Sequence, residues 1–554
     1  MNILKIFYVL VLTTIISSCG LSKMAKKYDS INIVITPEIL ETHAGEITLT
    51  LDAVFAEKYF AKKVNATFTP VLVYDEGETA FKAITIQGEK AIGGEKTIFY
   101  TTGGTFSYKD AIAYTSNMKN ADLELRAVGK INKKEKVLGV RKIGQGVIAT
   151  ATRIENNEIL ANNNHGYEHK TILEETATIY FLVNQSNIRT TEKSDSDIKK
   201  LSAFAKKGYK THSIEIKSFA SPEGTVNMND NVSDNRMKST LNYTKKLLRT
   251  LKVDGARNTD LYTETSIGED WEGFESLVQD SDIKDKRRIN KIVSSVEDLE
   301  LREQQIRDIA EIYDALEGDI LPQLRKAIII IRSFEPKRTD QEIASLSTTS
   351  PETLNVKELL FSATLTDDKS TKEKIYNSAV DLHNDWRGYN NIACMHIANG
   401  DLNTAMVYLN KATSISRENS DISTNKGIVA ARIGELANAQ VLFDKANTSE
   451  YNQATLDIRQ GEYKKAARFL KNGKTHNAAL AKIMNGDNSA TCYENTAACH
   501  YLNAIAAARA GKNDSVISNL TNAITANASY KAEATIDLEF VNLRKNEAFI
   551  ALIK

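Results

Sequence analysis

The stretch that decides the fold of the middle of the chain reads Ile214-Glu-Ile-Lys-Ser-Phe-Ala-Ser-Pro-Glu-Gly224. Three residues follow its final glycine at spacings of five, eight and twelve: Asn229, Val232 and Arg236. This spaced set is the most informative pattern in the sequence.

The pattern resembles the cell-wall-binding core of OmpA-like domains. That family reads I-x-G-H-x-D-x-x-G, followed by an Asn at five, an apolar residue at eight and an Arg at twelve. In the family, the Asp pairs with the ammonium of diaminopimelate in peptidoglycan, and the Arg pairs with its carboxylate. The resemblance therefore implies a degenerate peptidoglycan motif made of Ser221, Gly224, Asn229 and Arg236.

Ser221 departs from the family because it stands where the Asp belongs. A zwitterionic ligand needs two charges at a fixed separation, and Arg236 supplies one. Losing a charge-assisted contact costs about 1.5 to 3 kcal/mol of binding free energy. Glu223 lies close in sequence, but its side chain leaves from a different backbone position. Two interpretations stay open: a site that still binds peptidoglycan, and a fold retained for contacts with proteins.

The resemblance covers residues 174–337. It implies a first strand at 178–183, a helix carrying Ile198, Leu201 and Phe204, and a closing strand at 324–331. Between the second helix and the closing strand the chain carries an insertion, residues 253–323, that contains Glu269-Asp-Trp271. Together with Ala-Ser-Pro-Glu-Gly, this segment is similar to OmpA-like envelope proteins of the Bacteroidota. We expect an α/β OmpA-like domain with a helical insertion.

Residues 31–155 have the pattern of an all-β domain. Ile47, Leu49 and Leu51 alternate with polar residues, which is the period of a half-buried strand. Short strands separated by turn residues, such as 71–74 before Asp75-Glu-Gly77, predict an immunoglobulin-like sandwich.

Residues 156–173 are polar and predict a linker. His165 and His169 lie four residues apart in it with Glu168 between them, which raises the possibility of a metal site. The further ligands of zinc hydrolases are missing, so we expect solvated loop histidines and no metal.

The C-terminal part, residues 352–554, follows a predicted linker at 338–351 and carries an internal repeat. Four small residues recur with a shift of 34 residues: Ala393, Gly400, Ala405 and Ala412 return as Gly427, Gly434, Ala439 and Ala446. That is the tetratricopeptide period, with small residues where paired helices pack closely. We expect an all-α solenoid whose concave face holds a peptide or a partner domain.

The N-terminus has the layout of an export signal. Residues 1–18 carry Lys5, an apolar run and two small residues, which together predict a signal peptide. Ile16-Ser17-Ser18-Cys19 looks like a bacterial lipobox, in which Cys19 is lipidated. Residues 19–30 are then a lipid-anchored linker. Their basic character favours the periplasmic side of the outer membrane over display on the cell surface.

Formal charge is balanced at 71 basic against 71 acidic residues, so no electrostatic footprint for nucleic acid is present. Besides Cys19 there are three cysteines, Cys394, Cys492 and Cys499. Along one helix, the seven-residue spacing of the last two would hold them about 10 Å apart. We therefore favour buried free thiols over a disulfide.

The sequence contains no phosphate loop, nucleophile elbow or zinc-protease motif, so we expect a protein without enzymatic activity and without a cofactor. The leading hypothesis is a lipid-anchored envelope scaffold that binds other outer-membrane or periplasmic proteins, as part of an assembly, secretion or fimbrial machine. The alternative is a peptidoglycan-binding tether between the outer membrane and the cell wall.

Overall fold

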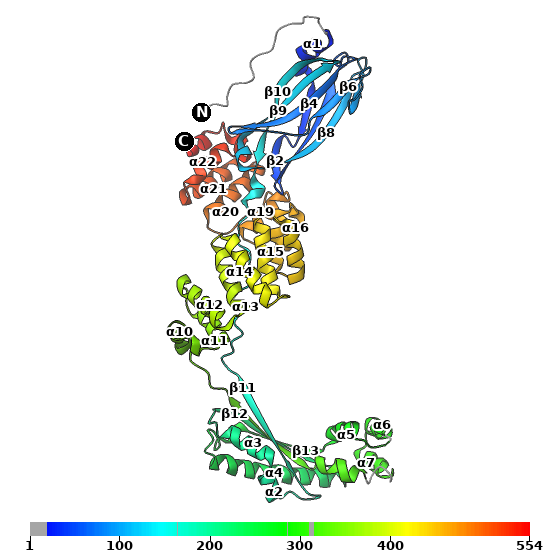
Figure 1. Ribbon diagram of the computed structural model, residues 1–554, viewed down its shortest axis with the longest axis vertical. Coiled ribbons are helices and arrows are strands. Elements are labelled where there is room, and N and C mark those ends of the chain that lie inside the picture. Colours follow the sequence, from blue (N-terminus) through cyan, green and yellow to red (C-terminus); the bar gives the residue numbers. More distant parts are fainter. Residues whose placement is uncertain (1–18, 163, 285, 310–314) are drawn as a thin grey trace. The chain divides into compact units, whose positions relative to one another are not determined.

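The chain divides into two units in the computed structural model, which describes residues 19–162, 164–284, 286–309 and 315–554. The first unit joins the part through Asn164 to Tyr376–Lys554, and the second is His165–Ile375. The first unit contains the strands drawn in blue and cyan and the helices drawn in yellow to red (Figure 1). The predicted signal peptide, residues 1–18, lies outside the described residues.

Ten strands form the N-terminal part of the first unit: β1 (Asn32–Thr36), β2 (Ile39–His43), β3 (Glu46–Phe55), β4 (Asn65–Tyr74), β5 (Gly77–Ala80), β6 (Ile84–Gly88), β7 (Lys96–Ile98), β8 (Gly104–Ala113), β9 (Ala121–Ile131) and β10 (Lys134–Ile148). They pair in the order β1-β3-β2-β10-β9-β4-β6-β7, with β5 beside β4 and β8 beside β3. Most neighbours are antiparallel, but β2 pairs with β10 and β6 with β7 in parallel. The predicted β-rich N-terminal part is confirmed, and the immunoglobulin-like arrangement stays a prediction.

Alternating burial builds the core of this sheet. In β3 the side chains of Ile47, Leu49 and Leu51 are buried, while Glu46 and Thr48 are exposed and Thr50 is half-buried. The predicted period-two pattern is therefore confirmed. Three short 3-10 turns lie beside the strands: η1 (Tyr28–Ser30), η2 (Ser116–Asn120) and η3 (Thr150–Arg153).

The segment before the first strand differs from the linker that was predicted for residues 19–30. A helix, α1 (Cys19–Lys26), packs on the sheet, and Leu21, Met24 and Tyr28 are all buried in its core. The Tyr28 hydroxyl donates to the carbonyl oxygen of Leu125 at 2.8 Å. The physical reason is spacing, because Leu21 and Met24 lie three positions apart on one face of α1, and Tyr28 follows in the turn η1. The folded body thus begins directly after Cys19.

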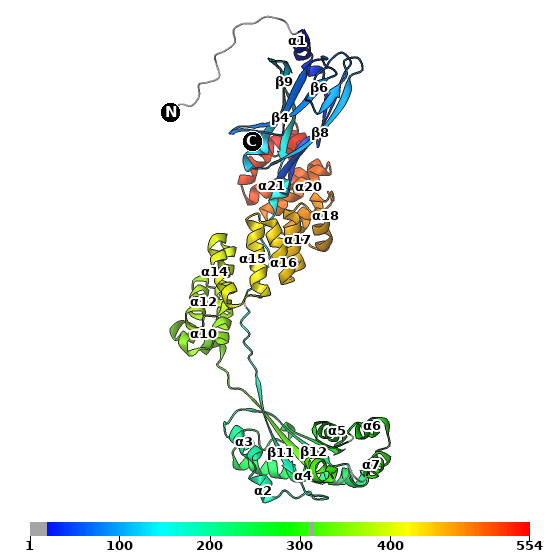
Figure 2. The same ribbon diagram turned by 45° about the vertical axis from the view of Figure 1, so that its right-hand side comes forward.

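The second unit is built on a four-stranded sheet. Its strands are β11 (Ile172–Tyr180), β12 (Thr211–Ala220), β13 (Tyr262–Glu269) and β14 (Lys326–Phe334), in the order β11-β14-β12-β13. The strand β14 is antiparallel to β11 and to β12, whereas β12 and β13 are parallel. Figure 2 labels β11 and β12 of this sheet. The predicted closing strand is present, but it begins at Lys326 and not at Leu324.

Helices cover one face of this sheet. The helices α3 (Ser196–Ala205) and α4 (Val226–Thr250) bury Leu201 and Leu248 against the apolar side chains of the strands. A short helix, α2 (Thr190–Lys193), precedes α3. The opposite face carries charges, because Arg332 of β14 pairs with Glu174 at 2.7 Å and with Glu215 at 2.9 Å.

The helical insertion starts later than the predicted boundary at Val253. Residues 262–269 pair with β12 as the edge strand β13 and so belong to the sheet. The insertion then comprises α5 (Trp271–Asp280), α6 (Lys286–Ser295), α7 (Leu299–Arg307), the π-helical turn η5 (Leu316–Ile320) and α9 (Leu321–Leu324). A further turn, η4 (Thr259–Leu261), precedes β13. Phe274 and Val278 are buried in the insertion's own core, with Trp271 packed against them.

Residues 338–351, which were predicted to be a linker, form structure. The helix α10 (Asp340–Thr349) begins with a capping box between Thr339 and Glu342. It is followed by η6 (Pro351–Thr353), α11 (Val356–Ser362) and η7 (Ala363–Leu365). The sequence predicts that the repeat region begins at residue 352. In the structure, residues 352–375 belong to the second unit.

The C-terminal part of the chain is an array of paired helices: α12 (Lys369–His383), α13 (Trp386–Ala398), α14 (Leu402–Ile415), α15 (Ser420–Arg432), α16 (Leu436–Ala446), α17 (Glu450–Arg459), α18 (Tyr463–Phe469), α19 (His476–Met484), α20 (Ala497–Arg509), α21 (Asn513–Ala526), α22 (Ser529–Ile536), the 3-10 turn η8 (Leu538–Leu543) and α23 (Glu547–Ile553). Gly400 and Gly434 end α13 and α15 with φ of 80° and 89°, a conformation that favours glycine. At Gly427, a Cβ would lie 2.4 Å from the Phe443 ring. The predicted tetratricopeptide-type repeat is confirmed.

Cys492 and Cys499 form a disulfide, with Cα atoms 5.4 Å apart, so the expectation of two free thiols was wrong. The expectation assumed that both cysteines lie on one helix. In fact α20 begins at Ala497, and Cys492 lies in the preceding loop, which folds back over the first turn of the helix. Cys394 is the free and buried thiol among the described cysteines. Among the residues that the structure describes, no helix is long and apolar enough to cross a membrane.

Candidate functional site

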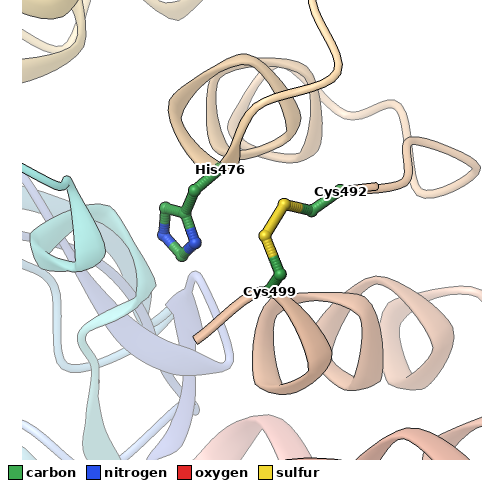
Figure 3. Close-up of side chains that lie close together, drawn as sticks. All are labelled: His476, Cys492 and Cys499. Atoms are coloured by element: carbon green, nitrogen blue, oxygen red, sulfur yellow. A yellow bond between two sulfur atoms is a disulfide. The ribbon is translucent and has the colours of Figure 1, made fainter. Parts of the chain in front are cut away.

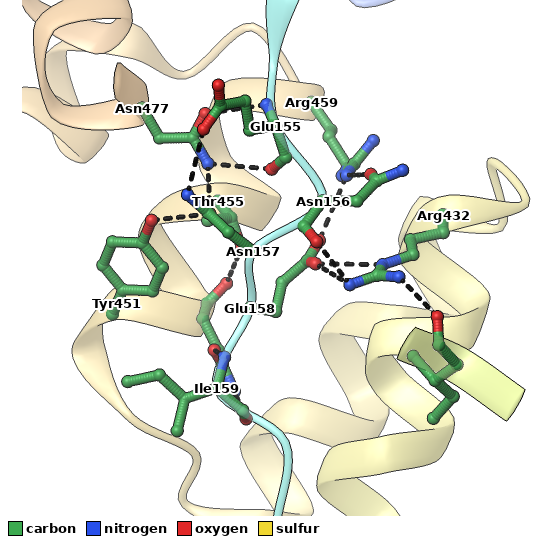
Figure 4. A network of polar contacts seen from close by, with 12 residues as sticks. Glu155, Asn156, Asn157, Glu158, Ile159, Arg432, Tyr451, Thr455, Arg459 and Asn477 are labelled. Atoms are coloured by element: carbon green, nitrogen blue, oxygen red, sulfur yellow. Dashed lines mark hydrogen bonds and ion pairs between the residues drawn. The ribbon is translucent and has the colours of Figure 1, made fainter. Parts of the chain in front are cut away.

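An extended polar network in the first unit surrounds residues 153–161, which we call the strap. The strap leaves the β-sheet after η3 and runs between the first helices of successive repeats, α13, α15, α17 and α19 (Figure 4). The sequence predicted a solvated linker from residue 156 onward. Residues 156–161 are instead bound along the repeat array.

Three asparagines of the array clamp the main chain of the strap. Each accepts a hydrogen bond from the N–H of one strap residue and donates to the carbonyl oxygen of the same residue. The pairs are Asn477 with Glu155 (2.9 and 2.9 Å), Asn452 with Ile159 (2.7 and 2.9 Å) and Asn425 with Ala161 (3.0 and 2.8 Å). Asn390 adds a second donor to the carbonyl of Ala161 at 2.8 Å. The clamped residues are separated by even numbers, as expected of an extended chain whose alternate residues face one side.

These clamps are buried, since Asn425, Asn452 and Asn477 are at most 1% exposed. A buried side-chain amide without hydrogen-bond partners lowers the stability of the fold by about 1 to 3 kcal/mol. If the strap left the groove, each of these asparagines would lose its hydrogen bonds to the main chain of the strap. Because the contacts are to N–H and C=O groups, they recognise an extended polypeptide and not a particular side chain.

One strap side chain is recognised through its charge. The carboxylate of Glu158 is 1% exposed and lies between two guanidinium groups (Figure 4). Arg432 approaches Glu158 Oε2 to 2.6 Å, and Arg459 approaches Oε1 to 3.1 Å. The same arginines also donate to the carbonyl oxygen and the side-chain oxygen of Asn156. A buried carboxylate held by two arginines fixes the register of the strap in the groove.

The N-terminal end of the strap is held by Arg153. Its guanidinium donates to Glu533 and Asp537, both at 3.0 Å, and lies 4.2 Å from the centre of the Tyr501 ring. Its main-chain carbonyl lies 2.8 Å from Nε2 of His476. Beside it, Arg509 pairs with Glu539 of the repeats and with Glu41 of the sheet. These contacts dock the β-sheet onto the last repeats of the same unit.

The groove of the array is therefore filled by the chain's own strap. The repeats were expected to hold a peptide or a partner domain there, and the described occupant is an internal segment. The chemistry of the site is the binding of extended polypeptide, with main-chain clamps and one acid-specific pocket.

Sequence reasoning missed the residues of this groove, although a signal was present. Asn425 and Arg432 recur as Asn452 and Arg459, with a shift of 27 residues. Within each helix, the Asn and the Arg lie seven residues apart and so share one face. The shift departs from the 34-residue period because the repeat formed by α15 and α16 is shortened, which hides the recurrence.

The degenerate motif lies in the second unit, at the end of β12 and the start of α4. The Ser221 hydroxyl donates to Glu223 at 2.6 Å, and Glu223 in turn pairs with Arg325 at 2.7 Å. The main-chain N–H of Gly224, whose φ is +107°, donates to Glu303 at 2.6 Å. These acceptors belong to the protein itself.

Asn229 and Arg236 are also held by internal partners. The Asn229 amide donates to Glu269 at 2.8 Å. Arg236 is 1% exposed and donates to the main-chain oxygens of Gln185, Phe219 and Leu182. Burial, together with the nearby Arg325, lowers the pKa of Arg236 to about 10. Each of the four predicted motif residues is thus bonded to a different internal partner, and the Arg236 guanidinium is directed into the protein.

The insertion supplies one of the carboxylates that accept hydrogen bonds from the motif residues. Glu303 of α7 accepts from Gly224 and also pairs with Arg307. Glu269, at the end of β13, accepts from Asn229 and from the Trp271 indole. Side chains of the insertion, including Trp271, Glu303 and Ile306, enclose the small space beside Pro222. A carboxylate of the protein therefore stands where an external acidic group would reach the Gly224 N–H.

The two loop histidines lie in the second unit and pack on aromatic rings. His169 is 3.2 Å from Asp340, and its ring lies edge-on to Phe361. His165 Nδ1 accepts from the Tyr167 N–H at 2.9 Å, and its ring also packs on Phe361. These contacts give the histidines a packing role in the second unit.

No protein-family model matches the chain, and no curated protein matches it. A solved tetratricopeptide repeat protein from Parabacteroides merdae is similar, with 14% identity over 49% of this chain and 100% of that chain, at a TM-score of 0.25. The APC/C hetero-tetramer Cut9–Hcn1 is similar with 12% identity over 65% of this chain and 60% of that chain, at a TM-score of 0.24. Both likenesses are too weak to carry an argument about function, which therefore rests on the contacts of the chain itself.

Proposed function

We propose that this protein is a non-enzymatic scaffold of a bacterial cell envelope. In this proposal a lipid on Cys19 anchors it in the outer membrane with its body facing the periplasm. It binds other outer-membrane or periplasmic proteins as a component of an assembly, secretion or fimbrial machine. An immunoglobulin-like β-part and an OmpA-like second unit belong to the same proposal.

The single observation that carries the proposal is the bound strap. The first helices of three repeats hold an extended polypeptide with their buried polar groups. Asn425, Asn452 and Asn477 bind its main chain, and two arginines bind Glu158. These contacts bind a polypeptide and do no chemistry on it. They also join the β-sheet and the repeats into one body, which we call the platform. Partner proteins then meet the outer surfaces of this platform and the second unit.

The position of α1 supports a close membrane attachment. Leu21 and Met24 are buried in the core of the sheet, only two and five residues after Cys19. A lipid on Cys19 would therefore hold the folded body at the membrane surface without a long tether. Each buried CH₂ of the acyl chains would contribute about 0.8 kcal/mol to membrane binding.

The peptidoglycan tether is the alternative, and the contacts of the motif favour the scaffold over it. Binding a stem peptide would require Gly224 and Asn229 to give up Glu303 and Glu269. It would also require Arg236 to leave three main-chain acceptors. In this proposal the motif region stabilises the second unit and does not hold the cell wall.

The proposal is tested by purifying the tagged full-length protein from envelopes in mild detergent, with mass spectrometry of what accompanies it. We expect a stoichiometric envelope protein, and we expect Cys19→Ser to move the bait from the membrane to the soluble fraction. The matched control is Cys394→Ser, which removes a thiol that is buried in the repeats. Recovery of the bait alone would contradict the scaffold. Recovery of cell-wall fragments without a protein would favour the tether.

A further inference from the structure

A second cluster of reactive side chains lies at the N-terminal end of the strap. His476 opens α19, Cys492 lies in the loop that follows, and Cys499 lies in the first turn of α20. All three are at most 3% exposed. One ligand atom from each, a ring nitrogen or a sulfur, lies within 4.8 Å of the other two (Figure 3).

The ring of His476 is held in a defined orientation. Its Nε2 lies 2.8 Å from the carbonyl oxygen of Arg153, and a carbonyl only accepts, so Nε2 carries the hydrogen. The lone pair is then on Nδ1, which has no hydrogen-bond partner among the described residues. The nearest carboxylate oxygen, on Glu155, is 3.7 Å away.

Figure 3 shows this ring facing the two sulfur atoms. Metal-binding histidines are commonly held in this way, with one ring N–H on a backbone carbonyl and the other nitrogen turned to the ion. A buried nitrogen that faces two sulfurs without a partner is the feature that points to a missing ligand.

A carboxylate lies beside the same sulfurs. Oε2 of Glu494 is 3.5 Å from Cys499 Sγ and 3.8 Å from Cys492 Sγ, and it accepts from the main-chain N–H of His476 at 3.0 Å. Around a tetrahedral zinc ion with Zn–S bonds of about 2.3 Å, neighbouring ligand atoms lie roughly 3.5 to 3.8 Å apart. Glu494 is exposed, so this side of the cluster is open to solvent.

We propose that His476, Cys492 and Cys499 form a binding site for Zn²⁺, or for another divalent ion that prefers thiolates, when the disulfide is reduced. Reduction requires a dithiol reductant, which supplies two electrons and two protons to the Cys492–Cys499 bond and itself becomes a disulfide. The ion then binds two thiolates and the Nδ1 of His476, and the two thiol protons pass to solvent. Glu494 or a water completes the coordination. The oxidised and the metal-bound forms are alternative states of one site.

The inference is tested on the full chain in its oxidised and reduced states, with free reductant removed and Zn²⁺ titrated against a coloured chelator. We expect about one Zn²⁺ per reduced chain and none held by the oxidised chain. His476→Ala should weaken the affinity of the reduced chain by at least about tenfold. The matched control is His500→Ala, on the neighbouring helix and bonded to Asn495, which should bind Zn²⁺ like the original chain.

The proposal is overturned if the reduced chain holds no more Zn²⁺ than the Cys492→Ser/Cys499→Ser double variant. A second readout does not depend on the folding of a variant. Co²⁺ added to the reduced original chain should give the thiolate-to-cobalt charge-transfer absorption that two cysteine ligands produce. Absence of that absorption would also overturn the proposal, and a disulfide with only a structural role would be the remaining account.

Discussion

At the scale of single residues, the buried carboxylate of Glu158 connects the strap to the repeats through two ion pairs. It is the counter-ion of Arg432 and Arg459, whose side chains are 8% and 14% exposed. Removing one partner of a buried ion pair costs about 3 to 5 kcal/mol, because the remaining charge is left buried and uncompensated. We therefore expect Glu158→Ala to lower the free energy of unfolding of the first unit by about that amount in urea denaturation.

The matched control for this change is Glu155→Ala. Glu155 is also on the strap, but its side chain is 36% exposed and its clamp with Asn477 uses only the main chain. We expect its effect to stay within about 0.5 kcal/mol. Equal losses in the two variants would contradict the role assigned to Glu158.

Glu303 gives the second unit a pH dependence. Burial raises the pKa of Glu303 above its ordinary value of 4.5. Just above that value the folded state binds more protons than the unfolded state, so stability rises as the pH falls toward 4.5 and is lost as the pH rises. Glu303→Gln cannot titrate and should flatten this part of the stability curve between about pH 5 and pH 7.

The measurement is the midpoint temperature of thermal unfolding of the second unit, taken at about pH 5 and about pH 7. Glu300→Gln is the control, because Glu300 lies on the same helix, α7, and is exposed. A rise of the unfolding midpoint of the original chain with pH over this range would contradict the predicted direction of the pH dependence. So would a Glu300 variant that matches the Glu303 variant.

At the scale of elements, the strap is held as a strand-like segment by the first helices of the repeats. Asn452→Ala would remove both the donor and the acceptor that serve Ile159. Losing this clamp should cost about 1 to 3 kcal/mol locally, which corresponds to a roughly ten- to hundredfold faster amide exchange in the strap. Hydrogen–deuterium exchange of peptides covering residues 155–161 measures it.

Asn438→Ala is the control for the clamp, because Asn438 lies on α16 and bonds to the exposed Glu435. It should leave exchange in the strap unchanged. Fast exchange of the strap in the original chain, at the rate of a solvated loop, would contradict the clamped conformation.

The repeats could be predicted from the sequence because their signal is local. Gly400 and Gly434 mark turns that only glycine adopts easily, and Ala405 and Ala439 mark close helix contacts, so the period is visible in the letters. The alternation of Ile47, Leu49 and Leu51 is equally local. In each case the residue type is dictated by its own backbone and its immediate neighbours.

The strap could not be predicted in the same way. Asn156, Asn157 and Glu158 have the composition of a solvated loop, and they are bound because the partners, such as Arg432 and Tyr451, lie about 300 residues away in sequence. The disulfide was missed for a related reason, since the first turn of α20 starts only after Cys492. The predicted motif stays a prediction, and sequence spacing did not reveal that Glu303 of the insertion and Glu269 of β13 accept from Gly224 and Asn229.

At the scale of the whole molecule, the strap crosses from the sheet to the repeats and makes them one unit. The chain passes through the second unit between Asn164 and Tyr376, so the two parts of the first unit are far apart in sequence. What joins them besides the covalent chain is the strap in its groove and the contacts of Arg153 and Arg509. This arrangement is the structural basis for the proposed scaffold.

The measurement that tests this account most directly is a cut chain. Protease sites inserted after Asn164 and in the loop at 366–368 would separate the second unit covalently from both parts of the first. We predict that the fragment ending at Asn164 still elutes with the C-terminal fragment in size-exclusion chromatography. The association should weaken when Asn425, Asn452 and Asn477 are all changed to alanine. If the two fragments of the original chain elute separately after cleavage, the strap does not hold the sheet to the repeats, and the account is contradicted.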